Sequence, residues 1–201
     1  MDNTLSKLSL RVKAGQVSKF LSLFQEGFFL NFATGSSLEE VLRSAGFSRE
    51  YLDARVQTVF LDGTAIDDFS TAIVKDGSVV ALSAAMPGLV GAIFRRGSPI
   101  AALRSVTDAA KDPLSGPDKT EMVRIKLFNT VAEEVGPELL QRGAVFGRAG
   151  LERFLSGRRE FVEQTLLEAE LCGDTLAPAS IFSVSFPNSE FIMLLVCESS
   201  S

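Results

Sequence analysis

The sequence predicts an α+β protein, and three observations carry this prediction. Segments 8–12 and 121–128 alternate apolar and polar residues, which is the pattern of strands with one buried face. Segment 131–140 instead repeats its apolar residues at helical spacing. Two pairs, Asp62-Gly63 and Asp76-Gly77, stand between apolar runs, where glycine supplies the positive φ that a tight turn needs. Strands, helices and turns are therefore expected to alternate along the chain.

Local signals divide the first half of the chain into elements. Ser36 or Ser37 can cap a helix, because a hydroxyl there accepts a hydrogen bond from an otherwise unpaired backbone amide. Gly27 stands where the C-terminal cap of an earlier helix is expected. From such signals the sequence predicts a strand at 8–12, a helix at 14–26, a strand at 28–32, a helix at 37–47, a connector at 51–55, and strands at 56–61 and 78–83.

A change in composition at residues 111–119 separates the first half of the chain from the second half. Segment 111–119, KDPLSGPDK, combines two prolines, a glycine and several charges, so it is the predicted linker. The sequence around it predicts a short helix after Pro99, a strand at 121–128, helices at 131–140 and 150–171 with a kink or break at Gly157, and a hairpin from 180–186 and 190–197. Two modules follow from this division, residues 1–110 and residues 119–201.

The order of elements in residues 36–91 is that of a β-grasp domain: a helix, a strand, an Asp-Gly turn and a last apolar strand. The pieces SLEEVLRSAGF, VQTVFLDGTAI and KDGSVVALSAAMPGLVG resemble the ubiquitin-like sulfur carriers of the molybdopterin and thiamin pathways. The resemblance implies a β-grasp fold for the N-terminal module. It also implies a Gly-Gly end whose carboxylate is adenylated and thiolated. This sequence has Gly88-Leu89-Val90-Gly91 at that place and continues, which argues against the carriers' activity.

A second stretch has a fainter resemblance to the same carriers. Lys126–Phe128 and Glu133–Gly136 are similar to their opening strand and helix, so a degenerate second copy is one interpretation of the C-terminal module. The later part of that module does not continue the match.

Composition excludes several classes of site. The chain contains no histidine, which removes Ser-His-Asp and Cys-His catalysis and histidine metal ligands. Its two cysteines, Cys172 and Cys197, are too few for a four-ligand zinc site, and we expect reduced, buried thiols. The carboxylates of Asp62, Asp67, Asp68 and Asp76 lack the spacing of a calcium loop and are expected to bond local backbone. The sequence therefore predicts no catalytic residue, no metal site and no cofactor.

The net charge and the hydropathy of the chain indicate which classes of partner it can bind and in which cellular compartment we expect it. The net charge is −5, without a dense stripe of lysine and arginine, which argues against nucleic acid as the main partner. The longest apolar run, Val79–Phe94, is shorter than a membrane span and contains Pro87-Gly88. The opening residues are polar where a secretory signal would be apolar. The sequence thus predicts a cytoplasmic protein that does not span a membrane.

One loop is the predicted ligand site. Glycines allow close approach of backbone amides to an anion, and arginines supply positive charge. The set consists of Gly88, Gly91, Arg95, Arg96 and Ser98. A solvated loop whose arginines pair with acids is the competing interpretation, because no Walker lysine or GxGxxG spacing is present.

The functional expectation is binding rather than turnover. The first hypothesis is a non-catalytic binding or scaffolding protein that contacts another protein or a copy of itself, as a homo-oligomer, through a sheet face or edge. The alternative is a binder of a small anion or nucleotide, or an enzyme, that uses the Gly88–Ser98 loop. A second alternative is a degenerate relative of the sulfur carriers without the terminal Gly-Gly.

Overall fold

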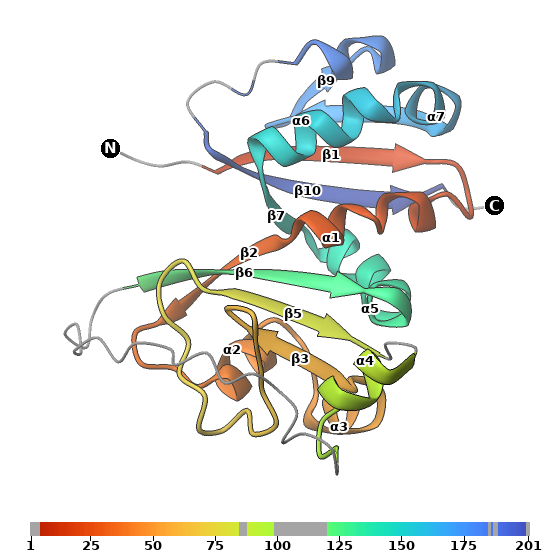
Figure 1. Ribbon diagram of the computed structural model, residues 1–201. Coiled ribbons are helices and arrows are strands. Elements are labelled where there is room, and N and C mark those ends of the chain that lie inside the picture. Colours follow the sequence, from red (N-terminus) through yellow and green to blue (C-terminus); the bar gives the residue numbers. More distant parts are fainter. Residues whose placement is uncertain (1–4, 85–87, 99–119, 185, 187–188, 200–201) are drawn as a thin grey trace. The chain divides into compact units, whose positions relative to one another are not determined.

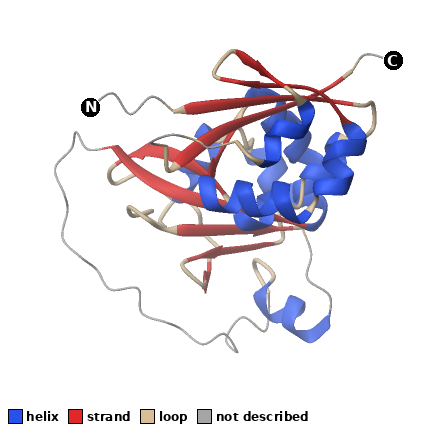
Figure 2. Ribbon diagram, turned by 90° about the horizontal axis from the view of Figure 1, so that it is seen from above, coloured by secondary structure: helices blue, strands red, loops and turns tan. Residues whose placement is uncertain are grey.

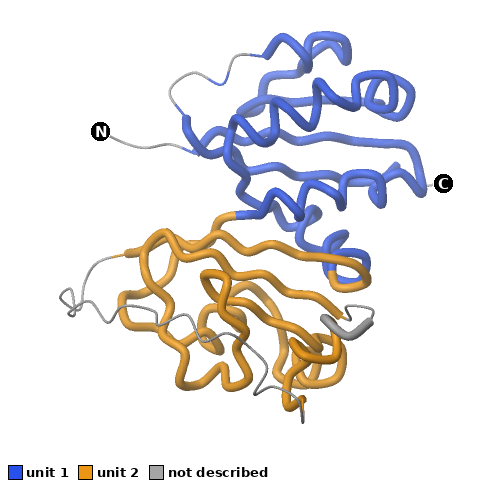
Figure 3. The backbone as a smooth tube through the Cα atoms, viewed as in Figure 1, with its two compact units in different colours: residues 1–28, 132–201 blue, residues 29–131 orange. Residues whose placement is uncertain are grey.

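A computed structural model describes residues 5–84, 88–98, 120–184, 186 and 189–199 of the protein (Figure 1). Within these residues it has ten strands and seven α-helices, which confirms the predicted α+β class. The chain forms two compact units, shown in different colours in Figure 3. Residues 1–28 and 132–201 make unit 1, and residues 29–131 make unit 2. The predicted linker at 111–119 and the predicted helix after Pro99 lie outside the described residues.

Unit 2 contains a mixed sheet with the strand order β4-β3-β5-β6-β2. The hairpin β3–β4 is antiparallel, β3 is antiparallel to β5, and β5 is parallel to β6. The strands are β2 (Phe28–Ala33), β3 (Thr58–Leu61), β4 (Thr64–Ala65), β5 (Val79–Ser83) and β6 (Thr120–Phe128). The helices are α2 (Leu38–Ser44), α3 (Arg49–Arg55) and α4 (Gly88–Phe94).

The register of this sheet separates a buried face from an outer face. Ile125 lies opposite Val80, and Leu127 lies opposite Leu82; all four side chains are fully buried. The side chains between them on β6 alternate to the other face and are half-buried. Leucines of α2 and α3, among them Leu42 and Leu52, complete the core. At 25 cal/mol per Å², burying each such side chain contributes about 1.5–3 kcal/mol, so the alternation fixes the register.

The predicted cap of α2 is confirmed at Ser37. Its Oγ accepts a hydrogen bond from the backbone N–H of Glu40, while the Glu40 carboxylate accepts from Ser37 N at 2.8 Å. This capping box satisfies donors that the first helical turn leaves unpaired. Hydrogen bonds that the backbone N–H and the hydroxyl of Ser37 donate to the carboxylate hold the pKa of Glu40 below its usual value.

The strands of unit 1 follow the order β7-β10-β1-β8-β9 within the ten-stranded sheet. Here β1 is parallel to β10 and antiparallel to β8, β10 is antiparallel to β7, and β8–β9 is a hairpin. The strands are β1 (Ser6–Val12), β7 (Ala144–Gly147), β8 (Leu166–Leu171), β9 (Asp174–Leu176) and β10 (Phe191–Glu198). The helical segments are η1 (Val17–Phe20), α1 (Leu23–Glu26), α5 (Asn129–Arg142), α6 (Arg148–Gly157), α7 (Arg159–Thr165) and η3 (Pro178–Phe182).

Aromatic rings fill the core of unit 1. Figure 2 distinguishes the helices, in blue, from the strands, in red. Phe24 is fully buried and meets Phe28 and Phe146 edge-on, with ring centroids 5.6 and 5.5 Å apart. Phe20 meets Phe161 edge-on and contacts Phe154 with a tilted ring. The phenylalanines therefore pack against one another, as their apolar character predicts.

Several local predictions are wrong. Residues 51–55, predicted as a connector, belong to helix α3, whose N-cap Ser48 accepts a hydrogen bond from Tyr51 N. Residues 166–171, predicted as the end of a long helix, form strand β8 because β1 pairs with them. The predicted hairpin of 180–186 with 190–197 is absent from the described residues: 178–182 is a 3-10 helix, and β10 pairs with β7 and β1.

The compact units do not follow the predicted division at 110 and 119. Strand β1 lies in the sheet of unit 1, between β10 and β8. Strand β6 lies in the sheet of unit 2, beside β5. Each half of the chain thus places its first strand in the unit that the other half mostly builds. That residues 1–110 and 119–201 are separate modules stays a prediction.

The two halves share one order of elements. Apart from the 3-10 helices η1 and η3 and helix α4, the first half runs β1, α1, β2, α2, α3, β3, β4, β5, and the second runs β6, α5, β7, α6, α7, β8, β9, β10. Residues with positive φ occur at corresponding places in the two halves. Asp62-Gly63 and Cys172-Gly173, all at positive φ, turn the hairpins β3–β4 and β8–β9. Gly27 and Gly143, at φ 101° and 96°, precede β2 and β7. That the C-terminal module is a degenerate second copy stays a hypothesis.

Candidate functional site

The predicted ligand loop is spread over a helix and the turn that follows it. Gly88 and Gly91 lie within α4, and Gly91 is buried. Arg95, Arg96 and Ser98 follow in a turn, in which Ser98 N donates to Arg95 O at 3.1 Å. Arg95 and Arg96 line an open cleft of about 450 Å³ together with Asp53, Val56, Gln57, Asp67 and Gly97. Gly91 and Ser98 are not among the described residues that line that cleft.

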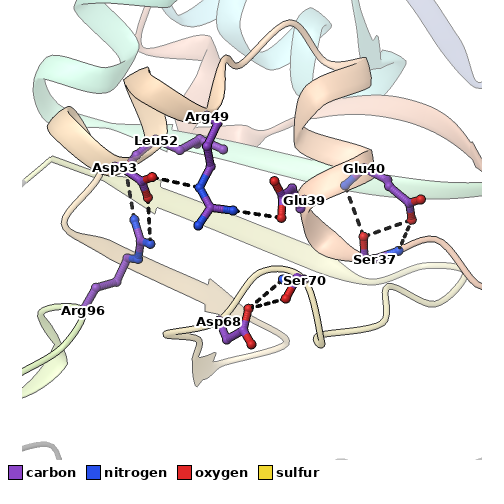
Figure 4. A network of polar contacts seen from close by, with 9 residues as sticks. All are labelled: Ser37, Glu39, Glu40, Arg49, Leu52, Asp53, Asp68, Ser70 and Arg96. Carbon is purple, nitrogen blue, oxygen red and sulfur yellow. Dashed lines mark hydrogen bonds and ion pairs between the residues drawn. The ribbon is translucent and has the colours of Figure 1, made fainter.

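Arg96 is engaged by the end of helix α3 (Figure 4). Its Nη1 donates to Leu52 O at 3.0 Å and to Val56 O at 3.4 Å, and its Nη2 contacts the Asp53 carboxylate at 3.2 Å. These carbonyls belong to the last turn, which a helix leaves unpaired and where the dipole favours a cation. The guanidinium also stacks on the Phe69 ring, 4.1 Å from its centroid. Arg96 therefore ties the loop to α3.

Asp53 stands at the centre of an ion-pair network. Arg49 Nε donates to Asp53 at 2.8 Å, and Arg49 also pairs with Glu39 of α2 at 2.9 Å (Figure 4). Hydrogen bonds from Arg49 and Arg96 hold the pKa of Asp53 below its usual value. The pKa of the Arg49 guanidinium is raised by Asp53 and Glu39. Carboxylates as well as guanidinium groups therefore line the cleft next to Arg96.

The turn carboxylates accept hydrogen bonds from backbone, but only Asp68 bonds the local backbone that was predicted; Asp62, Asp67 and Asp76 bond backbone far away in the sequence. Asp62 accepts from Val79 N at 2.7 Å, Asp76 from Met122 N at 2.9 Å, and Asp67 from Gly97 N at 3.0 Å. Asp68 accepts from Ser70 N and Ser70 Oγ (Figure 4), which lowers its pKa. Among the described residues, no group of histidine, cysteine, aspartate and glutamate is arranged to hold a metal ion. These acids fix loops to neighbouring strands.

Replacing Arg96 with alanine is expected to lower the free energy of unfolding of unit 2 by about 2–3 kcal/mol. The change removes charge-assisted hydrogen bonds, and it leaves the Leu52 and Val56 carbonyls without this donor. Urea unfolding followed by the near-UV signal of Tyr51, the only tyrosine, measures the effect in unit 2. Arg95→Ala is the matched control, because Arg95 is exposed, and a smaller loss is expected there. Equal losses for the two variants would contradict this role of Arg96.

The outer face of the unit 2 sheet is a second candidate site, which the sequence analysis did not single out. Arg124 and Lys126 stand two residues apart on β6 and point to this face, with Met122 one step before them. In register they lie opposite Val79 and Ala81 of β5. All five side chains are half-buried. The alternation in TEMVRIKLF contains the signal, because its core residues and its basic residues fall on opposite faces.

The charges of the two cations on this face are not paired with an acid among the described residues. Within the described part of the chain, neither side chain makes a hydrogen bond or an ion pair. Other cations of the protein do so; Arg11 pairs with Glu168, and Arg159 with Glu163. Phe60 continues the face on β3, where its ring lies 5.3 Å from that of Phe94 in α4. We call Phe60, Val79, Ala81, Met122, Arg124 and Lys126 the outer face of unit 2.

The cysteines are free but not buried. Cys172 is exposed because it forms the tight turn between β8 and β9, with φ at 53°. Cys197 is exposed on β10, opposite Arg11 of β1. The expectation of burial is wrong for both residues, and the expectation of reduced thiols stays a prediction.

Comparison with known proteins gives no relatives. No family model, no curated protein and no solved structure matches the chain. Among the helices that the structure describes, none has the length and apolar character to cross a membrane.

Proposed function

We propose that this protein acts by recognition, and that it binds an acidic, apolar segment of another protein on the outer face of unit 2. The observation that carries the proposal is the pair Arg124 and Lys126. Two neighbouring cations lie half-buried among apolar side chains and are not paired with an acid among the described residues, in a chain whose net charge is −5. A partner that supplies carboxylates would offset the partial desolvation of both groups.

The spacing of the cations defines the chemistry of the partner. Residues i and i+2 of a strand project from one face about 6.5–7 Å apart. An extended segment that carries acids at alternate positions presents its carboxylates at the same spacing. Apolar residues of that segment would cover Val79, Ala81 and Met122. Shape and charge together therefore favour a short extended peptide over a single small anion.

The predicted anion loop has less support. Arg96 already bonds helix carbonyls and Asp53, so an anion would have to compete with these contacts. The carboxylates of Asp53 and Asp67 line the same cleft and repel a negative ligand. The alternative that the loop binds a small anion is best tested at Arg95, because Arg95→Ala changes the cleft with less effect on stability than Arg96→Ala.

We also propose that unit 2 is the β-grasp-like module. Residues 36–91, which carry the resemblance, contain α2, α3, β3, β4 and β5. The support from the structure is that β2 and β6 complete one mixed sheet with these elements. The sulfur-carrier alternative has no support from the geometry, because Gly91 is buried inside α4 rather than at a free end.

The test of the docking proposal uses a synthetic peptide that alternates glutamate and leucine, titrated into ¹⁵N-labelled protein. We expect shifts in the amide signals of Val79, Ala81, Arg124 and Lys126, and weaker binding at higher salt because such charges are screened. The double variant Arg124→Glu/Lys126→Glu should bind at least about fivefold more weakly.

Two controls separate this site from general charge attraction. Lys7→Glu/Lys19→Glu makes the same change of charge at two exposed residues of unit 1 and should leave binding unchanged. A peptide with glutamine in place of glutamate should lose most of the affinity. Shifts spread evenly over the protein, or equal losses in the two double variants, would refute the proposed site.

A further inference from the structure

The exchange of first strands between the two halves leads to an inference that is independent of the docking face. In unit 2, β6 of the second half pairs with β5 of the first half over Val79–Ser83. In unit 1, β1 of the first half pairs over its whole length with β10 of the second half. Both strands are central in their sheets, between two neighbours. Neither unit is complete without a strand from the opposite half.

The exchanged strands carry core residues. On β6, Val123, Ile125 and Leu127 have no exposed surface. On β1, Leu8, Leu10 and Val12 are at most 2% exposed. Each strand therefore supplies a full row of buried side chains as well as the ladder hydrogen bonds of two neighbours. The contacts depend on the sequence of the inserted strand and not on which copy of the chain provides it.

We propose that two copies of this chain form a strand-exchanged dimer, in which the first half of each copy builds unit 1 and unit 2 together with the second half of the other copy. The exchange that the monomer makes between its own halves is then made between molecules. All contacts within each unit are the same in both forms, so the balance depends on protein concentration against the effective concentration of the tethered strand. In the dimer, a second copy of the chain supplies the strand at the position of β1 in unit 1 and at the position of β6 in unit 2.

A complementation experiment tests this proposal with full-length chains. Leu10→Pro disrupts β1, and Ile125→Pro disrupts β6, since proline in a central strand removes a ladder hydrogen bond and here also a buried side chain. The Leu10→Pro chain keeps an intact second half, with β6, and the Ile125→Pro chain keeps an intact first half, with β1. An exchanged pair can assemble one sound copy of each unit from the two chains.

The expected result is that each variant alone shows little cooperative unfolding, and that refolding the two together restores it in a one-to-one complex of twice the monomer mass. The control partner carries both prolines and should restore nothing when mixed with either single variant. Wild-type protein refolded at high concentration should also give a dimer fraction that persists on dilution, because return to the monomer requires unfolding.

Two outcomes would overturn the proposal. The first is a mixture of the single variants that remains as unfolded as its components, by circular dichroism and by light scattering after size exclusion. The second is a wild-type dimer that dissociates at once on dilution, which indicates association of finished surfaces and not exchange of strands. Failure of the peptide titration on the outer face would leave this result untouched, because that face is present in both forms.

Discussion

Replacing Phe24 with alanine is expected to lower the free energy of unfolding of unit 1 by about 3–5 kcal/mol. Phe24 has no exposed surface and lies between two rings, those of Phe28 and Phe146. Truncation removes these edge-on contacts and leaves a cavity that the surrounding rings cannot fill without leaving their own rotamers. A net stability of 5–15 kcal/mol is typical of a folded domain, so a loss of this size unfolds a large share of molecules in mild denaturant.

The packing around Phe24 leaves little room for relaxation. A methyl group added at Gly136 of α5 would come within 3.0 Å of the Phe24 ring and 2.6 Å of Leu21 Cδ2. Helix α5 therefore lies against this ring through a glycine, which holds the helix close. Movement of α5 into the cavity would require repacking of Leu21 as well. This close approach favours the upper part of the expected range.

The measurement is urea unfolding followed by far-UV circular dichroism, with midpoint and slope compared with those of the unchanged protein. Leu167→Ala is the matched control, because Leu167 also belongs to unit 1 but its side chain is 41% exposed. Its loss should stay below about 1 kcal/mol. A loss below about 1 kcal/mol for Phe24→Ala would mean that the rings do not form the core of unit 1.

Local rules predicted much of the secondary structure. Alternation identified β1 and β6, and the Ser37 cap and the Asp62-Gly63 turn were visible because each depends on a few neighbouring residues. The rules failed at β8, where Leu, Glu and Ala favour a helix and pairing with β1 overrides that preference. They also missed the turn at Cys172-Gly173, because cysteine is not a usual residue at positive φ.

The same limit applies to the candidate sites: the sequence shows which residues are present, but it does not show which distant residues contact them. The sequence could indicate that Arg95 and Arg96 carry positive charge next to glycines. It could not indicate that the end of α3, forty or more positions earlier, would engage Arg96. The basic pair on β6 was visible as an alternating pattern. Its significance depends on the absence of a paired acid among the described residues, which only the fold determines.

Pairing between distant strands was the largest gap, and it gives the prediction with the greatest expected effect. A chain that stops at residue 110 contains β1–β5 but lacks β6, β8 and β10. Its β5 would then expose Val80 and Leu82, which are fully buried beside β6, and its β1 would have no partner strand. We therefore expect the fragment 1–110 to lack cooperative unfolding and native near-UV signal from Tyr51.

The matched control for the fragment 1–110 is the fragment 29–131, which is of similar length but follows the bounds of unit 2. Residues 29–131 hold the strands of unit 2, including β6, apart from Phe28 at the start of β2. This fragment should unfold cooperatively and keep the Tyr51 signal, although it lacks the first 28 residues that the longer N-terminal fragment contains. Cooperative unfolding of 1–110 together with an unfolded 29–131 would show that the stable module follows the division along the sequence. The opposite result would show that a strand from beyond residue 119 completes it, because the core needs the row of side chains that β6 supplies.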